Sequence, residues 1–149
     1  MVPRILIAAD GQWVTDEVAA AVSGPDVELI TVASGLAVRP WLEENTDDEG
    51  GVDLVILDMQ IGNMGGMAVC QELRLEEGAG RLPRFPILML LDRRADVFLA
   101  RRVDAEGWLV KPLDPIRIRR AVGNLLEGAN YYDASYTPSP VLAIPPSSH

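Results

Sequence analysis

Three residues that can hold a metal ion or a phosphoryl group each stand directly after a short apolar stretch: Asp10, Asp58 and Lys111. Two carboxylates placed side by side repel each other unless a hard divalent cation such as Mg²⁺ lies between them. A lysine ammonium can then bind phosphate oxygens as a point charge. If the fold brings the three residues together, they predict a site for a cation and a phosphate group.

Lys111 is the only lysine among the 13 cationic side chains of the chain. A compositional preference for arginine that left one lysine by chance explains this pattern about as well as a functional need does. The functional interpretation is that this position needs a compact ammonium, because a broad guanidinium fork would not fit there. Both interpretations stay open from the residues alone.

The stretch from Val52 to Gly66 is the centre of the chain's organisation. Its residues 54–57, Leu-Val-Ile-Leu, form an apolar run typical of a strand buried on both faces of a parallel sheet. The run stops at Asp58, and glycines follow. A carboxylate just past the carboxyl end of a central strand lies where open α/β sheets bind their ligands. For Asp58 alone, a structural role in capping the next turn would be the simpler explanation.

Strand and helix signals alternate five times along the chain. The apolar runs that predict strands are residues 4–10, 27–33, 54–57, 85–91 and 108–110. Helices are expected around residues 14–22, 40–44, 67–78, 96–103 and 114–128, with Thr15 as the cap of the first and Asp114 as the cap of the last. Right-handed crossovers then give a flavodoxin-like doubly wound α/β fold, a five-stranded parallel sheet of order 2-1-3-4-5 with helices on both faces. In this order the first and third strands are neighbours, so Asp10 and Asp58 should share one crevice.

Composition narrows the function classes. The 149 residues fit one domain, and the net charge of −9 argues against nucleic-acid binding. No apolar run reaches the roughly 18 residues of a membrane-spanning helix. Cys70 is the only cysteine, so an internal disulfide is excluded and a reducing, cytoplasmic location is expected. The only histidine is His149, which argues against histidine-based catalysis and a histidine-rich metal site.

Taken together, the motifs resemble the receiver domain of two-component response regulators over about residues 4–128. Four segments carry the resemblance: Ile-Leu-Ile-Ala-Ala-Asp ending at Asp10, Asp-Leu-Val-Ile-Leu-Asp ending at Asp58, the Asn-Met-Gly-Gly loop that follows, and Leu-Val-Lys-Pro around Lys111. The chain then divides into a receiver domain, residues 1–128, and a Pro/Tyr-rich C-terminal tail, residues 129–149.

The resemblance implies a role for each matching residue. Asp58 would accept a phosphoryl group from a sensor histidine kinase or a phosphotransfer protein. Mg²⁺ would be bound by Asp10, Asp58 and the backbone carbonyl of Gln60, while Lys111 would contact the phosphoryl oxygens. The peptide bond before Pro112 would be cis. Such a receiver signals to a downstream protein target.

Several positions depart from the family pattern. Ala9 replaces the first of two acids at the end of the first strand, so we expect Mg²⁺ to bind weakly. In the switch region, Leu91 stands where a hydroxyl residue normally follows the phosphoryl group, and Asp92 replaces the small residue after it. Gly62 replaces a loop proline. Trp108 keeps the aromatic switch position of the fifth strand.

The tail differs from the rest of the chain in composition. It holds all three tyrosines and four of the 11 prolines, but no lysine or arginine. A solvated extension is one interpretation. The apolar segment Val141–Ile144 predicts instead that the tail packs against the last helix of its own domain, or on a second copy in a homodimer.

The leading hypothesis is a single-domain response regulator that is phosphorylated on Asp58 and signals through protein–protein contacts, without enzymatic activity of its own. The alternative is a pseudo-receiver, a protein-binding module that is not phosphorylated, which Ala9 and Leu91 favour. A Mg²⁺-dependent phosphatase of the haloacid-dehalogenase type also uses an aspartyl nucleophile. It needs a second acid two residues on, where this chain has Gln60. A fused DNA-binding domain does not fit the length.

Overall fold

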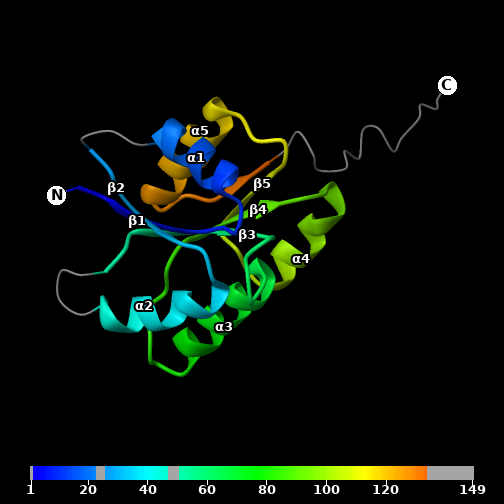
Figure 1. Ribbon diagram of the computed structural model, residues 1–149. Coiled ribbons are helices and arrows are strands. Elements are labelled where there is room, and N and C mark those ends of the chain that lie inside the picture. The colour runs from blue at the N-terminus through cyan, green and yellow to red at the C-terminus, as the bar shows by residue number, and fades with distance from the viewer. Residues whose placement is uncertain (1, 23–25, 47–50, 134–149) are drawn as a thin grey trace.

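The computed structural model describes residues 2–22, 26–46 and 51–133 of the chain (Figure 1). In this part the strands and α-helices are, in chain order, β1 (Arg4–Ala8), α1 (Gln12–Val22), β2 (Glu28–Val32), α2 (Val38–Glu44), β3 (Leu54–Asp58), α3 (Gly66–Gly78), β4 (Ile87–Leu91), α4 (Val97–Arg102), β5 (Gly107–Val110), α5 (Pro115–Leu126) and β6 (Tyr131–Tyr132). Two single 3₁₀ turns, Gly35–Ala37 and Arg94–Asp96, lead into α2 and α4.

The strands form one parallel sheet of order β2-β1-β3-β4-β5-β6. Helices α1 and α5 cover one face of this sheet, and α2, α3 and α4 cover the other (Figure 1). Parallel strands need crossover connections, and the helices in these connections bury both faces. The predicted α/β fold, with strand order 2-1-3-4-5 and helices on both faces, is confirmed.

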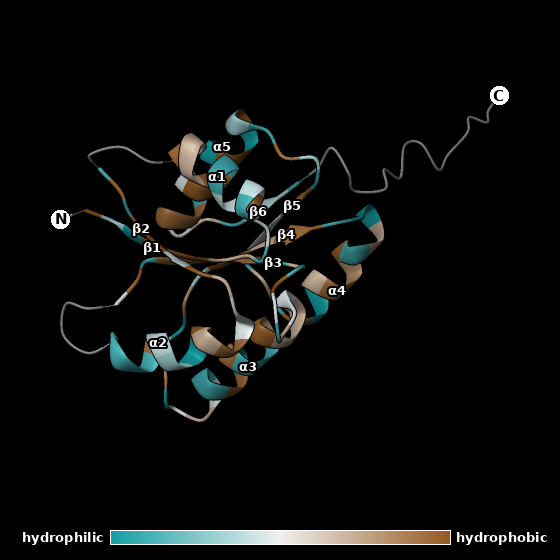
Figure 2. Cartoon of the chain, viewed as in Figure 1, coloured by the Kyte–Doolittle hydropathy of each residue, from teal (hydrophilic) through white to brown (hydrophobic). Residues whose placement is uncertain are grey.

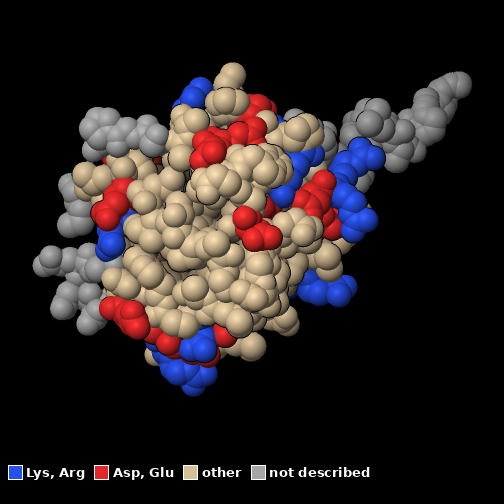
Figure 3. All heavy atoms as spheres, in the orientation of Figure 1, with Lys and Arg blue, Asp and Glu red and all other residues tan. Residues whose placement is uncertain are grey.

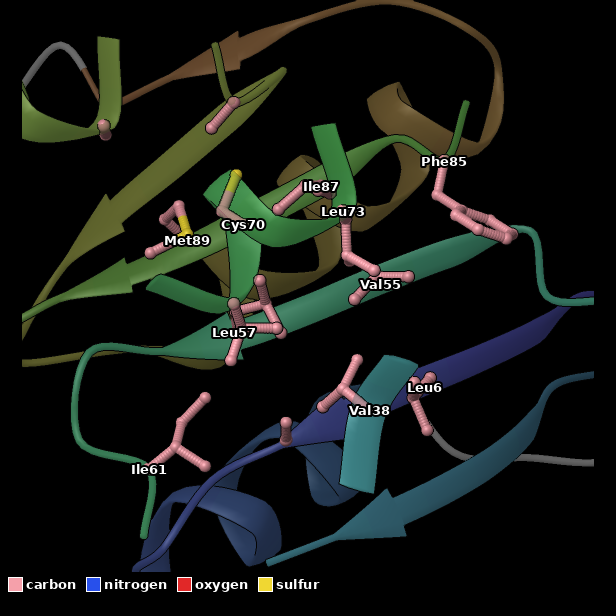
Figure 4. Packing of buried hydrophobic residues seen from close by; sticks show 14 of the residues in the cluster. Leu6, Val38, Val55, Leu57, Ile61, Cys70, Leu73, Phe85, Ile87 and Met89 are labelled. Carbon is pink, nitrogen blue, oxygen red and sulfur yellow. The ribbon is translucent and has the colours of Figure 1, made fainter. Parts of the chain in front are cut away.

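A hydrophobic core lies on each side of the sheet, because successive side chains of a strand point to opposite faces. In β4, Met89 and Leu91 belong to the core under α2, α3 and α4, whereas Leu88 and Leu90 belong to the core under α1 and α5. Figure 4 shows the first core, where side chains of the strands meet those of α2 and α3. The apolar sides of the helices turn toward the sheet (Figure 2).

Charged side chains are spread around a largely uncharged centre on the face seen in Figure 3. One network ties the amino end of β5 to its neighbours: Arg74 and Arg84 both form ion pairs with Glu106, whose Oε1 also accepts the N–H of Ile87 at 2.8 Å.

Within the described ranges, no helix is long and apolar enough to cross a membrane.

The start of α1 differs from the prediction. The sequence predicts Thr15 as its cap, but the helix begins at Gln12 and Thr15 lies inside it. The reason is that the carbonyl of Gly11 already accepts hydrogen bonds from the N–H groups of Val14 and Thr15. The predicted buried face is confirmed, since Val14 and Val18 are both in the core.

Two other helix starts lie close to the predicted ones. Helix α2 was expected from residue 40 but begins at Val38, so Pro40 is its third residue, where the missing N–H costs no helical hydrogen bond. At the start of α5 the Asp114 carboxylate accepts the N–H of Arg117 at 2.9 Å, and Pro115 is the first helical residue.

The sheet has one strand more than the five predicted. Strand β6 pairs in parallel with β5 and lies in the segment that the sequence predicts to be a tail. A strand of two residues is too short to show the alternating pattern that identifies longer strands. The predicted docking segment Val141–Ile144 lies outside the described residues, and the division of the chain at residue 128 stays a prediction.

Candidate functional site

The centre of the candidate site is an ion pair between the ends of two strands. Asp58 is the last residue of β3, and Lys111 directly follows β5. The Nζ atom of Lys111 lies 2.5 Å from Oδ1 of Asp58. Only 1% of the Asp58 side chain and 13% of the Lys111 side chain are exposed, so water screens the pair weakly.

A second carboxylate reaches the same ammonium from the end of β4. Asp92 Oδ1 lies 2.8 Å from Lys111 Nζ, and Asp92 Oδ2 accepts a hydrogen bond from the side-chain amide of Gln60, also at 2.8 Å. Asp92 therefore turns into the site. The indole ring of Trp13 lies 5.8 Å from the ammonium, within the range of a cation–π contact.

Burial and the ion pairs set the charges of these groups. Burial raises the pKa of Asp58, and the hydrogen bond and charge of Lys111 offset this only in part. Burial alone would lower the pKa of Lys111, but its hydrogen bonds to Asp58 and Asp92 raise it overall. For Asp92, hydrogen bonds from Gln60 and Lys111 outweigh burial, and the pKa is lowered. With both carboxylates ionised, the three groups carry one net negative charge.

A glycine fixes the backbone next to Asp58. A Cβ atom at Gly66 would lie 2.2 Å from the carbonyl oxygen of Asp58, closer than real carbon–oxygen contacts. Only glycine therefore lets α3 begin directly against the end of β3. This close approach holds the Asp58 backbone against the first residue of a helix.

Asp10 is joined to this group through its backbone. Its N–H donates to the carbonyl of Gln60 at 3.0 Å, which links the end of β1 to the loop after β3. Its exposed carboxylate lies beside Gly62, where an added Cβ would be 3.4 Å from Asp10 Oδ1. In the part of the chain that the structure describes, no three His, Cys, Asp or Glu side chains are grouped as a metal centre.

The donors at this edge still suit Mg²⁺. This ion commonly binds through one or two carboxylates and keeps several waters, so it does not need a full protein cage. Asp10 and Asp58 could supply two carboxylates, and the Gln60 carbonyl keeps a second lone pair after it accepts the Asp10 N–H. A cation held by so few protein groups is expected to bind weakly.

Two residues of the predicted switch region, Leu91 and Trp108, are buried. Leu91 is part of the core under α2, α3 and α4, and its carbonyl accepts the Lys111 N–H at 2.9 Å. Trp108 is 2% exposed, and its ring stacks on that of Tyr132 with centroids 4.4 Å apart. The Arg101 guanidinium lies 5.6 Å from the Trp108 ring. Trp108 is thus in contact with residues of both α4 and β6.

The peptide bond between Lys111 and Pro112 is cis. Beside it lies a pair that the sequence analysis missed: Arg117 donates to the Pro112 carbonyl at 2.5 Å and forms an ion pair with Asp133. One signal for this pair was present in the sequence. Asp133 is the only aspartate, glutamate, lysine or arginine between residues 129 and 149. The contacts of Trp13 and of the Gln60 side chain were also missed.

Comparisons with known proteins agree with the resemblance. Residues 5–123 match the model of the response regulator receiver domain. An uncharacterized response regulatory protein of Mycobacterium tuberculosis is 34% identical over 129 residues, which cover 83% of this chain and 90% of that protein.

Solved structures show the same fold. A two-component response regulator of the LuxR family from Aurantimonas has a TM-score of 0.73 at 20% identity, with 91% of this chain and 93% of the other covered. A chemotaxis response regulator of Vibrio cholerae has a TM-score of 0.67 at 23% identity, with 84% and 99% covered.

Proposed function

Because this chain belongs to the response regulator receiver domain family, the signalling modules of two-component systems, we propose that it accepts a phosphoryl group on Asp58. Response regulators interact with histidine kinases and downstream targets, and receiver domains are signalling modules rather than enzymes. The observation that carries the proposal is the buried Asp58 carboxylate at the carboxyl edge of the sheet, 2.5 Å from the only lysine of the chain. We further propose that this receiver acts as a single domain, through contacts with a protein target.

The proposed donor is a phosphohistidine of a sensor kinase or phosphotransfer protein. An Asp58 carboxylate oxygen attacks phosphorus, so that a P–O bond forms and the P–N bond breaks. The departing ring nitrogen keeps the electron pair of the broken bond, and a proton on the other ring nitrogen lets the histidine leave as neutral imidazole. Lys111 favours the ionised, nucleophilic form of Asp58 and then neutralises charge on the phosphoryl oxygens.

Mg²⁺, when bound by Asp10, Asp58 and the Gln60 carbonyl, would supply further positive charge at the phosphoryl oxygens. The Asp92 carboxylate would have to share Lys111 with the new phosphoryl group. Since Asp92 also accepts from Gln60, it can keep one partner if the ammonium moves toward the phosphoryl oxygens.

A second candidate function is a pseudo-receiver that binds a partner without phosphorylation. The specific observation in its favour is Leu91, which is fully buried in the core and has no hydroxyl with which to follow a phosphoryl group. The missing acid at Ala9 also favours it.

Intact mass after incubation with acetyl phosphate and Mg²⁺ separates the two functions. We expect the wild-type protein to gain the mass of one phosphoryl group and Asp58→Asn to gain none. Chelation of Mg²⁺ should slow the wild-type reaction. A wild-type protein that gains no mass at any Mg²⁺ concentration would support the pseudo-receiver instead.

Asp53→Asn is a suitable control, because Asp53 precedes the opposite end of β3 and accepts the N–H of Arg4 at 2.9 Å. This variant loses a carboxylate next to the same strand but should still be phosphorylated. Equal labelling of Asp58→Asn and the wild type would place the modification on another residue and refute the assignment.

A further inference from the structure

Residues Tyr131, Tyr132 and Asp133, which we call the C-terminal strap, lie alongside β5. Tyr131 pairs with Gly107 and Tyr132 with Trp108 in parallel register, and the Tyr131 N–H donates to the carbonyl of Glu106 at 3.1 Å. The strap lies beyond residues 5–123, which match the family model. It is therefore a feature of this chain that the family match does not describe.

A glycine in β5 provides the place where the strap packs. A Cβ atom at Gly107 would lie 2.7 Å from the carbonyl oxygen of Tyr131, so any larger residue would push the strap away. One residue further along, the rings of Tyr132 and Trp108 stack. The strap thus has a close backbone contact and an aromatic contact on successive residues of β5.

Asp133, the last residue of the strap, is buried and contacts Val110, the residue that precedes Lys111. Only 1% of Asp133 is exposed, and its Oδ2 accepts the N–H of Val110 at 3.0 Å. The same oxygen forms an ion pair with a guanidinium nitrogen of Arg117. A buried carboxylate needs such partners, since an uncompensated one would be strongly destabilising.

Arg117 contacts the backbone on both sides of Lys111. Its guanidinium donates to the Pro112 carbonyl at 2.5 Å and approaches the Val110 carbonyl at 3.4 Å. Asp133 and Arg117 together therefore bind backbone groups on both sides of Lys111. The Lys111 N–H is itself bound by the Leu91 carbonyl at 2.9 Å. Hydrogen bonds therefore hold the backbone before Lys111, at its N–H and after it.

We propose that Asp133 is a positioning residue of the phosphoryl site, which holds Lys111 against Asp58 through Val110 and Arg117. The strap is then a part of the site that lies in the C-terminal segment. If the strap left β5, the Lys111 ammonium would be held less firmly against Asp58. The proposal deepens the proposed function and rests on it, because it is Lys111 that would contact the phosphoryl oxygens. Side chains that bind phosphoryl groups act best when surrounding contacts hold them in place.

The chain offers a direct probe, since Lys111 is its only lysine. Labelling with ¹⁵N-lysine gives one side-chain ammonium signal in NMR spectra that needs no assignment. In the wild-type protein we expect slow hydrogen exchange at Nζ, because Asp58 and Asp92 both accept its hydrogen bonds. In Asp133→Asn we expect the signal to move toward that of free lysine and to exchange about tenfold faster, as for a lost charged hydrogen bond.

Glu106→Gln is the matched control. Glu106 also binds an arginine, Arg74, and a strand N–H, that of Ile87, but it does so next to the opposite end of β5. Its loss should lower stability while the Lys111 signal stays unchanged. Asp133→Glu keeps the charge, so it should give an intermediate Lys111 signal.

Each outcome decides the proposal. A folded Asp133→Asn protein with the wild-type Lys111 signal would overturn it. If both Asp133 variants fail to fold while Glu106→Gln folds, Asp133 has a structural role only, and the proposal is also overturned. The NMR readout concerns the unphosphorylated protein. A wild type that fails to gain a phosphoryl group would therefore refute the proposed function without affecting the positioning result.

Discussion

The ion pair between Asp58 and Lys111 leads to a quantitative prediction about stability. Replacing Lys111 by Met keeps most of the side-chain volume but leaves the Asp58 carboxylate buried without its cation. Removing one partner of a buried pair typically costs about 3–5 kcal/mol. The same change in an Asp58→Asn background removes no buried countercharge, so it should cost much less.

The distance between the two groups sets the size of the coupling. At 2.5 Å, Coulomb attraction amounts to about 7 kcal/mol for an effective dielectric constant of 20, and to about 2 kcal/mol in bulk water. Desolvation of both groups opposes this attraction. We therefore expect a coupling free energy of about 2–3 kcal/mol, near the upper range for a charged hydrogen bond.

The assay is urea unfolding of the wild type, both single variants and the double variant, which together form a double-mutant cycle. The result should depend on pH. Loss of Lys111 raises the folded-state pKa of Asp58 further above its unfolded value. Between these two pKa values the folded state binds more protons than the unfolded state. The stability of Lys111→Met should therefore fall as pH rises from the unfolded-state pKa to the folded-state pKa. Wild type shows the same sign over a narrower window, because burial already raises the pKa of Asp58.

Additive free energies of unfolding, within about 0.5 kcal/mol, would refute this reasoning. So would a Lys111→Met protein whose stability rises with pH over the same window. Either result would mean that the Asp58 charge is compensated by groups other than Lys111.

Other predictions concern the switch region, the strap and the cysteine. Leu91→Thr should lower stability by about 2–4 kcal/mol in thermal or urea unfolding, because Leu91 is fully buried in the core; an unchanged midpoint would contradict the packing described. Gly107→Ala should displace the strap and increase hydrogen exchange at the Tyr131 amide, whereas Gly123→Ala, with open space around its Cβ position, should not. Burial raises the pKa of Cys70 to about 11, so thiol labelling of the folded protein should stay slow until the solution is strongly alkaline; rapid labelling at neutral pH would show that α3 opens locally.

The fold and the centre of the site could be predicted because their signals are local. The apolar run before Asp58 and the short strand before Lys111 identify two strand ends, and parallel topology brings strand ends to one edge. The inward turn of Asp92 could not be predicted, because it depends on a partner that is 19 residues away and follows another strand. The residue type of Thr15 predicts a cap, but the backbone hydrogen bonds of Gly11 decide where α1 begins.

The strap illustrates a different limit. Its position is determined by the missing side chain at Gly107 and by the burial of Asp133. Neither feature produces the periodic pattern of apolar residues that identifies strands and helices in a sequence. A strand of two residues gains its stability from tertiary contacts rather than from its own sequence. The single charge in the tail was the only hint that the segment has a fixed partner.

The position of Trp13 gives the protein a spectroscopic reporter of its own site. Its ring lies 5.8 Å from the Lys111 ammonium, yet 60% of the residue is exposed. Trp108, in contrast, is enclosed by Arg101 and Tyr132, away from solvent. A cation beside an indole changes the emission of that indole, so movement of the ammonium toward or away from Trp13 should be read in its fluorescence. The Trp13 part of an emission change on occupation of the site should therefore report the position of Lys111, whereas the Trp108 part would report rearrangement inside the core.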